Sequence, residues 1–455
     1  MKIKIDSRKV EKNDTFIAVR GIENDGHKYI EAAIANGASK IIAEEGNYSV
    51  ETEIVSDTKK YLVDYLESNY LDKIKNLKKI GVTGTNGKTT TCYLIYQLLN
   101  TLGVKSAYMG TIGFFYGDVK KDLANTTPDI YDLYDMFLEC LENDVEYIVM
   151  EVSSHALALE RVRNTEFEVA GFSNLTKDHL DFHLTEENYI EAKKKLFYQT
   201  TGFKIINGDD PLYENFLIED NNLLYGFKSH NDVLLKNDVI KIDGTSFEFE
   251  MNNEVYKVNN DLVGSYNIYN FMMAVLIANK VGFDIENVLE KSKDILPPPG
   301  RTEIIKFNNR LAVVDYAHTP DAVLNILENT NLYKEGKVYT IVGCGGNRDT
   351  SKRPIMGDIA TRLSDYVIFT NDNSRKEDPS LIMNDIVSNL DANNFEVILD
   401  RGLAIKKGVE LLEEKDILLI LGKGHENYQI VGTEKSYFSD KDEVLKNIEN
   451  KKLRK

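Results

Sequence analysis

The feature that most limits how this chain can fold is a glycine-rich loop between an apolar strand and a helix. In the segment KKIGVTGTNGKTTTCYLIYQLLNTLG, residues 78–103, we expect the strand to end near Thr83 and the helix to begin near Lys88. Glycines let backbone N–H groups approach phosphate oxygens, and a helix N-terminus adds a dipole that favours anions. The segment therefore predicts a phosphate-binding loop at the edge of a sheet.

The loop matches the common phosphate-binding pattern GxxxxGK[ST] imperfectly, because Val82 stands where the pattern has its first glycine. A turn that only links a strand to a helix is the alternative. The GKTT ending favours phosphate binding, since Lys88 would place a cation on the terminal phosphates and the Thr89 hydroxyl would ligate Mg²⁺. The residues predicted to bind nucleotide phosphates are Gly84, Thr85, Asn86, Gly87, Lys88, Thr89 and Thr90.

Strand-like apolar runs and helical stretches alternate along most of the chain, which indicates mostly parallel sheets covered by helices. The clearest strand-like runs are residues 2–5, 15–19, 40–43, 145–152, 167–172, 311–314, 338–342, 366–370, 396–399 and 417–421. An amphipathic helix is expected near 28–36. The three prolines of LPPPGR, residues 296–301, make a stiff connector. At roughly 150 residues per domain, the length suggests three domains, which we place at 1–77, 78–298 and 299–455.

Composition excludes several classes of protein. The chain has 55 basic and 73 acidic residues, and its net charge of −18 argues against binding to nucleic acid or to an anionic membrane. Its three cysteines lack CxxC spacing, which argues against a disulfide framework or a thiolate metal site. No apolar run approaches the ~20 residues of a membrane-spanning helix, and the N-terminus has no apolar signal-peptide core. We expect a cytoplasmic monomer whose partners are small molecules.

Glu151 closes a second apolar run, in the segment MEVSSH. In open α/β sheets, ligands bind at the carboxyl ends of the strands. A carboxylate at that edge, one strand after a phosphate loop, would hold Mg²⁺ together with phosphate and water oxygens. The alternative is a glutamate that only forms a salt bridge at a strand end.

Two further segments are rich in polar residues. The loop NLTKDHLDFH, residues 174–183, is too dense in polar side chains to serve packing alone, although a single histidine such as His183 is more often a structural hydrogen-bonding group than a ligand. The next helix contains three consecutive lysines at 193–195, which by themselves indicate a solvated helix face. These residues alone do not single out one lysine.

The order of the motifs resembles that of the Mur ligase family. The motifs are DSR, GTNGKTT, EVSSH, NLTKDHLDFH, AKxxLF, GSYNIYN, PPPGR, DYAHTP, GCGGNRD, LGKGHENYQ and FSD, and they extend over nearly the whole chain. The resemblance implies an α/β fold with an N-terminal UDP-binding domain, a central P-loop ATPase domain with a mostly parallel sheet, and a C-terminal Rossmann-like domain.

The resemblance also implies a reaction. The γ-phosphoryl group of ATP would move onto a carboxylate, and the amine of an amino acid would attack the acyl phosphate and release phosphate. The branch of the family with these motifs would add meso-diaminopimelate to UDP-MurNAc-L-Ala-D-Glu in the synthesis of peptidoglycan precursors.

Roles around the phosphate loop follow from the same resemblance. The implied catalytic residues are Lys88, Lys193 and His179. The implied Mg²⁺ ligands are Thr89, Glu151, His179 and a carbamylated Lys193, the lysine of the AKxxLF motif. A carbamate would replace a cation that repels Mg²⁺ by an anionic oxygen ligand. The other two lysines of the triplet keep the interpretation of a solvated face.

For the nucleotide, the resemblance implies that Asn267 and Asn270 contact adenine, with a helix that begins at about Ile268. An amide group offers a donor and an acceptor to a purine edge; the alternative for this pair is a helix cap and a core-facing side chain. Arg301 and Asp315 would reach ATP from the third domain, on its phosphates and ribose. A site completed by another domain implies closure and exclusion of water.

The remaining assignments concern the UDP-sugar and the amino acid. The implied UDP-MurNAc-dipeptide residues are Ser7, Arg8, Asp25–His27, Thr126, Thr127, Pro128, Ser153 and Arg161. Serines and threonines in such loops often simply cap helices. The implied amino-acid residues are Arg348, Asp372, Asn373, Arg375, Gly422 and Glu426.

Arg375 decides the expected amino acid, because a guanidinium clamps the distal carboxylate of diaminopimelate and repels the distal cation of lysine. Ser374 replaces the proline that the family has before this arginine, so the other stereoisomer, L-lysine or another diamino acid stays an alternative. So does a P-loop NTPase that uses hydrolysis as a switch, which would release phosphate without an amino acid. The DSR, DNSR and GHE motifs speak against the folylpolyglutamate-type and D-Ala-D-Ala-adding ligases of the same superfamily.

Overall fold

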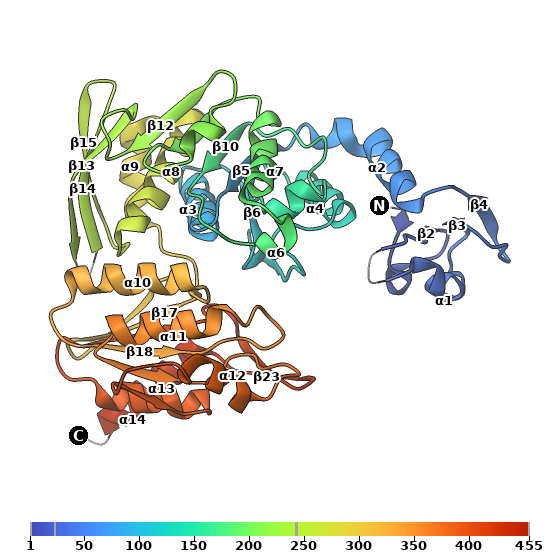
Figure 1. Ribbon diagram of the computed structural model, residues 1–455. Coiled ribbons are helices and arrows are strands. Elements are labelled where there is room, and N and C mark those ends of the chain that lie inside the picture. Colours follow the sequence, from blue (N-terminus) through green and yellow to red (C-terminus); the bar gives the residue numbers. More distant parts are fainter. Residues whose placement is uncertain (1, 22–23, 242–243, 454–455) are drawn as a thin grey trace.

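The computed structural model describes residues 2–21, 24–241 and 244–453. It contains three sheets and one separate hairpin, each sheet within a different part of the chain. The N-terminal part lies to one side, and the C-terminal part lies against the central part (Figure 1). This arrangement confirms the predicted three-domain α/β fold, while the domain boundaries stay a prediction.

The N-terminal part is a four-stranded parallel sheet in the order β1-β2-β3-β4, joined to the rest of the chain by helix α2. Its elements are β1 (Ile3–Lys4), the 3-10 turns η1 (Ser7–Lys9) and η2 (Gly26–Tyr29), β2 (Thr15–Ile17), α1 (Ile30–Ala35), β3 (Lys40–Ala43), β4 (Glu51–Ile54) and α2 (Thr58–Ile74). The predicted helix near 28–36 is therefore a 3-10 turn followed by a short α-helix.

The central part is an eleven-stranded sheet in the order β15-β14-β13-β12-β11-β10-β5-β9-β6-β7-β8. Its strands are β5 (Lys78–Thr83), β6 (Ser106–Gly110), β7 (Gly113–Tyr116), β8 (Val119–Lys121), β9 (Tyr147–Glu151), β10 (Val169–Phe172), β11 (Lys204–Asn207), β12 (Asn222–Gly226), β13 (Val233–Lys241), β14 (Gly244–Met251) and β15 (Glu254–Asn260). The middle of the sheet is parallel, as predicted. The antiparallel strands at both edges were not predicted.

Helices cover both faces of the parallel strands. One core packs α3 (Lys88–Thr101) and α8 (Ser265–Lys280) on one face, and another packs α4 (Ile130–Glu142) and α7 (Glu186–Tyr198) on the other. The shorter helical elements are α5 (Ser154–Ala158), α6 (Leu180–His183), η3 (Tyr213–Phe216), α9 (Ile285–Lys291) and η4 (Ser292–Asp294). Burial on both faces explains why β5 and β9 read as continuous apolar runs.

The C-terminal part is a six-stranded sheet in the order β16-β17-β21-β18-β19-β20, parallel except at β16. Its elements are β16 (Glu303–Phe307), β17 (Arg310–Asp315), α10 (Pro320–Tyr333), β18 (Val338–Val342), α11 (Lys352–Leu363), β19 (Tyr366–Phe369), α12 (Pro379–Val387), β20 (Phe395–Val397), α13 (Arg401–Leu411), β21 (Ile417–Leu421), the hairpin β22 (Tyr428–Val431) and β23 (Glu434–Tyr437), and α14 (Asp440–Leu453). The predicted strands are confirmed throughout the chain, with ends that shift by at most two residues. No helix in the described ranges is both long and apolar enough to span a bilayer.

Lys79 links the N-terminal part to the central sheet by hydrogen bonds. It is the second residue of β5, its side chain is buried, and its Nζ donates hydrogen bonds to the carbonyls of Ile74 (2.6 Å) and Leu77 (2.7 Å) at the end of α2. Carbonyls at a helix C-terminus lack partners within the helix, so a cation there is favourable. Burial nevertheless lowers the pKa of Lys79 to about 8.

We expect Lys79→Met to remove a pH dependence of stability. The pKa of Lys79 is about 8 in the folded chain and its ordinary value is 10.5, so the unfolded chain binds more protons between these pH values. The free energy of unfolding of the native chain therefore rises over this range, by up to about 3 kcal/mol. Urea unfolding of both proteins across the range measures the difference; a difference that stays constant with pH would contradict the assignment.

Candidate functional site

The predicted phosphate loop lies between β5 and α3, at the carboxyl end of the parallel strands. Gly84 and Gly87 have φ angles of 149° and 87°. A Cβ at Gly84 would lie 1.9 Å from Ser173 Oγ, and one at Gly87 would lie 2.4 Å from Asn270 Oδ1. Only glycine fits these two positions, which leaves the loop backbone open towards the space above the sheet.

The loop after β10 holds the phosphate loop in shape. Asn174 Oδ1 accepts a hydrogen bond from Asn86 N at 2.9 Å, and Ser173 Oγ donates to Asn86 O at 2.6 Å. The hydroxyls of Thr85 and Tyr189 are 3.1 Å apart. The NLTKDHLDFH segment thus begins with a residue that supports the loop backbone.

Two lysines, the buried Lys193 and the half-buried Lys88, meet at one carbonyl of this loop. Lys88 Nζ donates to Gly84 O and Thr85 O, both at 2.8 Å, and Lys193 Nζ donates to the same Gly84 O at 2.8 Å. Burial lowers the pKa of Lys88 and lowers that of Lys193 well below its usual range, and the charge of Lys88 adds to the effect on Lys193. Within the described residues, neither lysine forms an ion pair with a carboxylate. An anion bound beside the pair would favour the charged form of both lysines.

Glu151 ends β9 and is completely buried. Its Oε1 accepts hydrogen bonds from Tyr108 Oη (2.5 Å) and Thr111 N (2.9 Å), and its Oε2 accepts from Thr89 Oγ1 (2.9 Å) and Thr111 Oγ1 (3.1 Å). The glutamate is held by hydroxyls and an amide, and the alternative of a strand-end salt bridge is wrong. Its carboxylate and the Thr89 hydroxyl lie side by side.

His179 directly precedes α6 with a φ angle of 54° and makes an edge contact with the ring of His155, at 4.7 Å between centroids. Burial lowers the pKa of His179; Lys88 and Lys193 lower it further, and Asp178 opposes them. The imidazole is therefore neutral at pH 7, which is the form that binds metals. His183 donates to or accepts from Ser154 Oγ at 3.0 Å, in keeping with the structural interpretation.

The oxygen-rich pair Thr89–Glu151 fits Mg²⁺, which prefers a few protein oxygens together with phosphate and water. Across the described part of the chain, no cluster of three or more His, Cys, Asp or Glu side chains has the geometry of a metal site. These residues thus fit a cation that phosphate oxygens hold in large part, and they do not form a cage of protein ligands.

Asn267 and Asn270 lie inside α8, which begins at Ser265, so the expectation of a helix that begins at about Ile268 is wrong. Asn267 Nδ2 donates to Val263 O at 2.8 Å, and Asn270 Nδ2 donates to Asn267 Oδ1 at 3.0 Å. Asn270 Oδ1 accepts from Thr91 Oγ1 at 3.2 Å. Both amides are buried, and Asn270 joins α8 to α3 beside Gly87; the role of the two residues at adenine stays a prediction.

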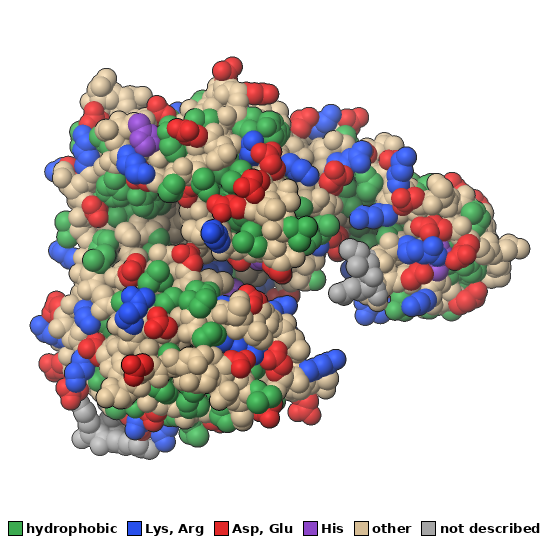
Figure 2. Space-filling view, viewed as in Figure 1, with side chains coloured by type: hydrophobic (Ala, Val, Ile, Leu, Met, Phe, Trp, Pro, Cys, Tyr) green, Lys and Arg blue, Asp and Glu red, His purple; other side chains and the backbone are tan. Residues whose placement is uncertain are grey.

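The C-terminal part reaches the phosphate loop and Thr89 with two side chains, Arg301 and Asp321. Arg301 Nη2 lies 3.4 Å from Thr89 Oγ1, its guanidinium covers the ring of Tyr316, and its buried Nε has no hydrogen-bond partner among the described residues. Asp321 Oδ2 accepts from Asn86 Nδ2 at 2.7 Å. Asp315, by contrast, accepts hydrogen bonds from the backbone amides of Thr302 and Ala317. The space-filling view shows a hollow between the central and C-terminal parts (Figure 2).

The residues assigned to the UDP-sugar peptide fall into two groups. Thr127 Oγ1 donates to Glu151 O (2.8 Å) and accepts from Ser153 N (3.1 Å), while Arg161 Nη1 donates to Thr127 O (3.0 Å). Thr126 lies 3.2 Å from Thr111, hydroxyl to hydroxyl. Ser153 also caps α5, as the alternative interpretation has it. This group is one network beside Glu151.

The second group lies on the N-terminal sheet. Ser7 is buried in η1, whereas Arg8 is exposed and pairs with Asp6 at 2.7 Å. His27 Nδ1 lies 2.7 Å from Asp25 Oδ1, and its Nε2 accepts from Glu44 N at 2.9 Å, so the ring proton is on Nδ1. The described contacts do not join this group to Thr127 or Arg161.

The amino-acid residues converge at the ends of β18, β19 and β21. Asn373 Nδ2 donates to Glu426 Oε2 at 2.7 Å, and Glu426 also lies 3.2 Å from Lys423 Nζ. Arg375, at φ 51°, donates from Nη1 to Gly346 O at 2.8 Å. Within the described residues its guanidinium pairs with no carboxylate.

The other members of this set differ in exposure. Asp372 is buried, and a Cβ at Gly422 would lie 2.7 Å from Asp372 Oδ2, so a side chain at Gly422 would displace that carboxylate. Arg348 is exposed. Ser374 is fully buried and its Oγ has no hydrogen-bond partner among the described residues, which is consistent with a position that an apolar side chain also fills.

Sequence reasoning missed Tyr108, Thr111, Asp321 and Lys423. Two of these could have been found from their motifs, because Lys423 is part of LGKGHE and Asp321 follows DYAHTP. Tyr108 and Thr111 could not, because they reach Glu151 only through the neighbouring positions of β6 and β9 in the sheet.

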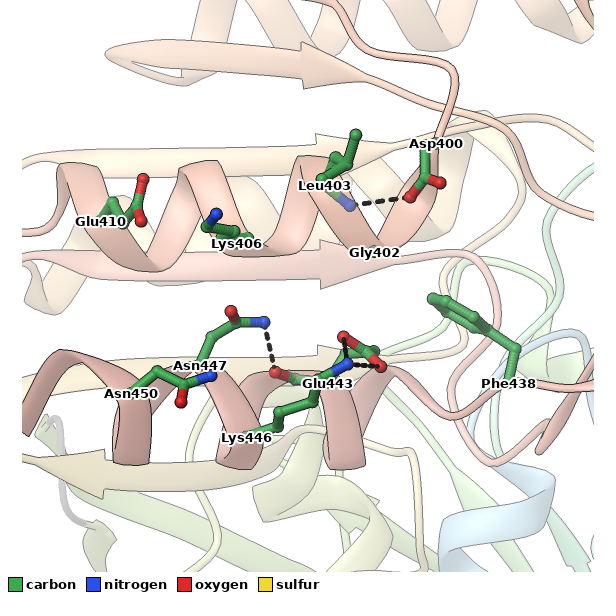
Figure 3. Close-up of a pocket in the computed structure, with 10 residues that line it drawn as sticks. All are labelled: Asp400, Gly402, Leu403, Lys406, Glu410, Phe438, Glu443, Lys446, Asn447 and Asn450. Carbon is green, nitrogen blue, oxygen red and sulfur yellow. Dashed lines mark hydrogen bonds and ion pairs between the residues drawn. The ribbon is translucent and has the colours of Figure 1, made fainter. Parts of the chain in front are cut away.

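A separate groove of about 530 Å³ lies between α13 and α14, with Asp400 and Phe438 at one end (Figure 3). None of the predicted site residues lines it.

Family models match three successive segments of the chain. Residues 2–74 match the Mur ligase family, catalytic domain; residues 82–278 match the Mur ligase middle domain; and residues 300–424 match the Mur ligase, glutamate ligase domain. The three matches follow the order of the three sheets.

Curated relatives and solved structures resemble the whole chain. UDP-N-acetylmuramoyl-L-alanyl-D-glutamate--2,6-diaminopimelate ligase of Clostridium botulinum is 38% identical over 98% of this chain and 95% of its own, and that of Fusobacterium nucleatum is 40% identical over 99% and 94%. A solved structure of a ligase of this name has a TM-score of 0.69 at 32% identity and covers 99% of this chain and 95% of its own. The MurF ligase from Thermotoga maritima in complex with ADP has a TM-score of 0.71 at 21% identity, covers 100% and 98%, and shows a shared fold.

Proposed function

Because this chain belongs to the Mur ligase family, we propose that it is an ATP-dependent ligase that joins meso-diaminopimelate to UDP-MurNAc-L-Ala-D-Glu in peptidoglycan precursor synthesis. The two relatives named above, similar along nearly their whole length, carry names that state a 2,6-diaminopimelate ligase. The choice of the meso isomer rests on Arg375.

One observation carries the proposal. Lys88 and Lys193 come from different helices, and both donate from Nζ to the carbonyl oxygen of Gly84. Two cations that share an oxygen in a site of low polarity repel each other unless an anion lies between them. The terminal phosphates of ATP and a carboxyl group awaiting activation supply that charge.

The side chains then have distinct tasks in forming the acyl phosphate. When ATP binds, Lys88 gives up its hydrogen bonds to the two loop carbonyls and donates to phosphate oxygens instead. The backbone amides of the loop donate to the phosphates as well. Arg301 reaches Thr89 from the C-terminal part and adds a further cation beside the phosphates. Phosphoryl transfer needs positioning and charge neutralisation more than covalent help from the protein, and these residues provide both. Domain closure around them keeps water from the acyl phosphate.

Thr89, Glu151 and His179 would hold Mg²⁺ against the phosphates. Bound Mg²⁺ supplies charge neutralisation on the transferred phosphoryl group. Tyr108 and Thr111 hold the Glu151 carboxylate in one orientation before any ligand arrives. The neutral imidazole of His179 presents a nitrogen lone pair rather than a charge.

The surroundings of Lys193 support its carbamylation. Its lowered pKa leaves part of the amine neutral, and a neutral amine attacks the carbon of CO₂ to give a carbamate with the release of one proton. The carbamate N–H would still donate to Gly84 O, and Lys88, which donates to the same oxygen, would offer a cation to the new anionic group. The modification therefore resolves the repulsion between the two lysines and creates an oxygen ligand.

Arg375 selects the nucleophile by the charge at its far end. The guanidinium uses one nitrogen on the carbonyl of Gly346 and keeps its other donors for a carboxylate. Diaminopimelate has a carboxylate and an ammonium at its distal carbon, and Arg375 and Glu426 lie on either side of Asn373 to receive them. Lysine offers only the ammonium.

We expect Lys193→Ala to lose most ligase activity, and a high concentration of acetate or formate to restore part of it. A small carboxylate then occupies the cavity and replaces the carbamate oxygens. Phosphate release in the presence of all three substrates measures the effect. Lys194→Ala is the control, because Lys194 is the neighbouring residue and pairs with Glu191 on the helix surface. An alanine variant at 193 with full activity would refute the assignment.

The substrate is tested by phosphate release with ATP, Mg²⁺ and UDP-MurNAc-L-Ala-D-Glu, with meso-diaminopimelate or L-lysine as the amine. We expect the native enzyme to prefer meso-diaminopimelate, and Arg375→Ala to lose about a hundredfold in kcat/KM for it, as loss of a charge-assisted bidentate pair implies. Arg362→Ala is the control, an exposed arginine of the same domain paired only with Asp358. Faster turnover with lysine contradicts the role of Arg375, and phosphate release without any amino acid favours the NTPase switch.

A further inference from the structure

Arg401 and Asp440 form an ion pair that is completely buried in the C-terminal part. Arg401 begins α13 and Asp440 begins α14; Nε lies 2.7 Å from Oδ1 and Nη2 lies 2.7 Å from Oδ2. Both side chains are 0% exposed. Removing two ions from water costs about as much as their attraction returns, so such a pair is weak evidence for a role in stability alone.

The other contacts of Arg401 point towards the amino-acid residues. Its Nη2 donates to Leu421 O at 3.0 Å, and its Nη1 lies 3.5 Å from Asn371 O. Leu421 ends β21 just before Gly422, and Asn371 directly precedes Asp372. β19 and β21 are not paired with each other, because β18 lies between them in the sheet. The guanidinium of Arg401 therefore connects the first residues of two loops that no strand hydrogen bonds connect.

The charge of Arg401 also acts on those loops. Burial opposes the charged form, but Asp440, Asp372 and Glu426 outweigh burial and raise the pKa of the guanidinium. Glu426 also forms an ion pair with Lys423, with Nζ 3.2 Å from Oε2.

We propose that Arg401, held by Asp440, is a positioning residue for the amino-acid pocket: it fixes the spacing between the Asp372–Arg375 loop and the Gly422–Glu426 loop. The proposal rests on the proposed function of these loops. Arg401 itself touches no substrate, because it lies beneath both loops. Its effect is on the distance between Arg375 and Glu426, the two groups that receive the distal end of the amino acid.

A purely structural role makes a different prediction. The pair also anchors the first residues of α13 and α14, the helices that border the groove of Figure 3. If anchoring were its only task, its loss would lower the melting temperature and leave the KM for the amino acid unchanged. A split between the KM values of the three substrates separates the two roles.

The test uses Arg401→Lys, which keeps the positive charge and removes the planar guanidinium group that bonds to both loops. With ATP and UDP-MurNAc-L-Ala-D-Glu saturating, we expect the KM for diaminopimelate to rise about tenfold, since hydrogen bonds to a charged group are lost at both loops. The KM for ATP should change less than about twofold, because the contacts of the phosphate loop are untouched.

Arg310→Lys is the matched control. Arg310 also bonds two backbone segments of the C-terminal part, with Nε donating to Leu412 O at 3.1 Å and Nη1 to Asn308 O at 2.7 Å. It stands at the start of β17, however, and thus at the opposite end of the strands from the amino-acid residues. We expect this variant to leave both KM values unchanged. An equal rise in the KM for diaminopimelate in the two variants would overturn the proposal.

A double variant covers the case in which Arg401→Lys does not fold. Arg401→Met with Asp440→Leu replaces the pair by apolar side chains of similar size, a change that buried ion pairs often tolerate. It should fold, keep the KM for ATP and raise the KM for diaminopimelate. A folded double variant with the native KM for diaminopimelate refutes the proposal. A native enzyme that shows no phosphate release dependent on diaminopimelate refutes instead the proposed function.

Discussion

The site depends on two ammonium groups that share one carbonyl oxygen. Lys88 and Lys193 lie in different helices, and each donates to Gly84 O at the carboxyl end of β5. Burial lowers the pKa of both groups, so the arrangement is unfavourable without an anion. The ligase chemistry follows from this constraint, because phosphates, a carbamate and a carboxyl group are the anions that fit beside such a pair. Glu151 and Thr89 add the oxygen atoms that a divalent cation needs.

The order of the strands brings these groups together. β5 lies between β10 and β9, so the phosphate loop, the loop that begins at Ser173 and the end of β9 at Glu151 meet at one edge of the sheet. The C-terminal part completes the site through Arg301 on Thr89 and Asp321 on Asn86. A site divided between two parts of the chain couples binding of nucleotide to closure, and closure in turn excludes water from a phosphorylated carboxyl group.

The sequence reveals those parts of the fold and the site whose physical signal is local. Strands such as β5 and β9 are buried on both faces and read as apolar runs, and the glycines of the phosphate loop stand between a strand and a helix. The edge strands β13–β15 were missed because one face is exposed and polar residues interrupt them. Tyr108 was missed because its bond to Glu151 depends on strand order.

The most direct test of the account follows an oxygen atom. If a carboxyl group is phosphorylated in this site, one of its oxygens must leave with the phosphate when the amine attacks. We predict that ¹⁸O placed in the D-glutamate γ-carboxyl group of UDP-MurNAc-L-Ala-D-Glu appears in the inorganic phosphate released during turnover with diaminopimelate, one atom for each peptide bond formed. Phosphate free of ¹⁸O, in a reaction that forms the tripeptide, would contradict the account.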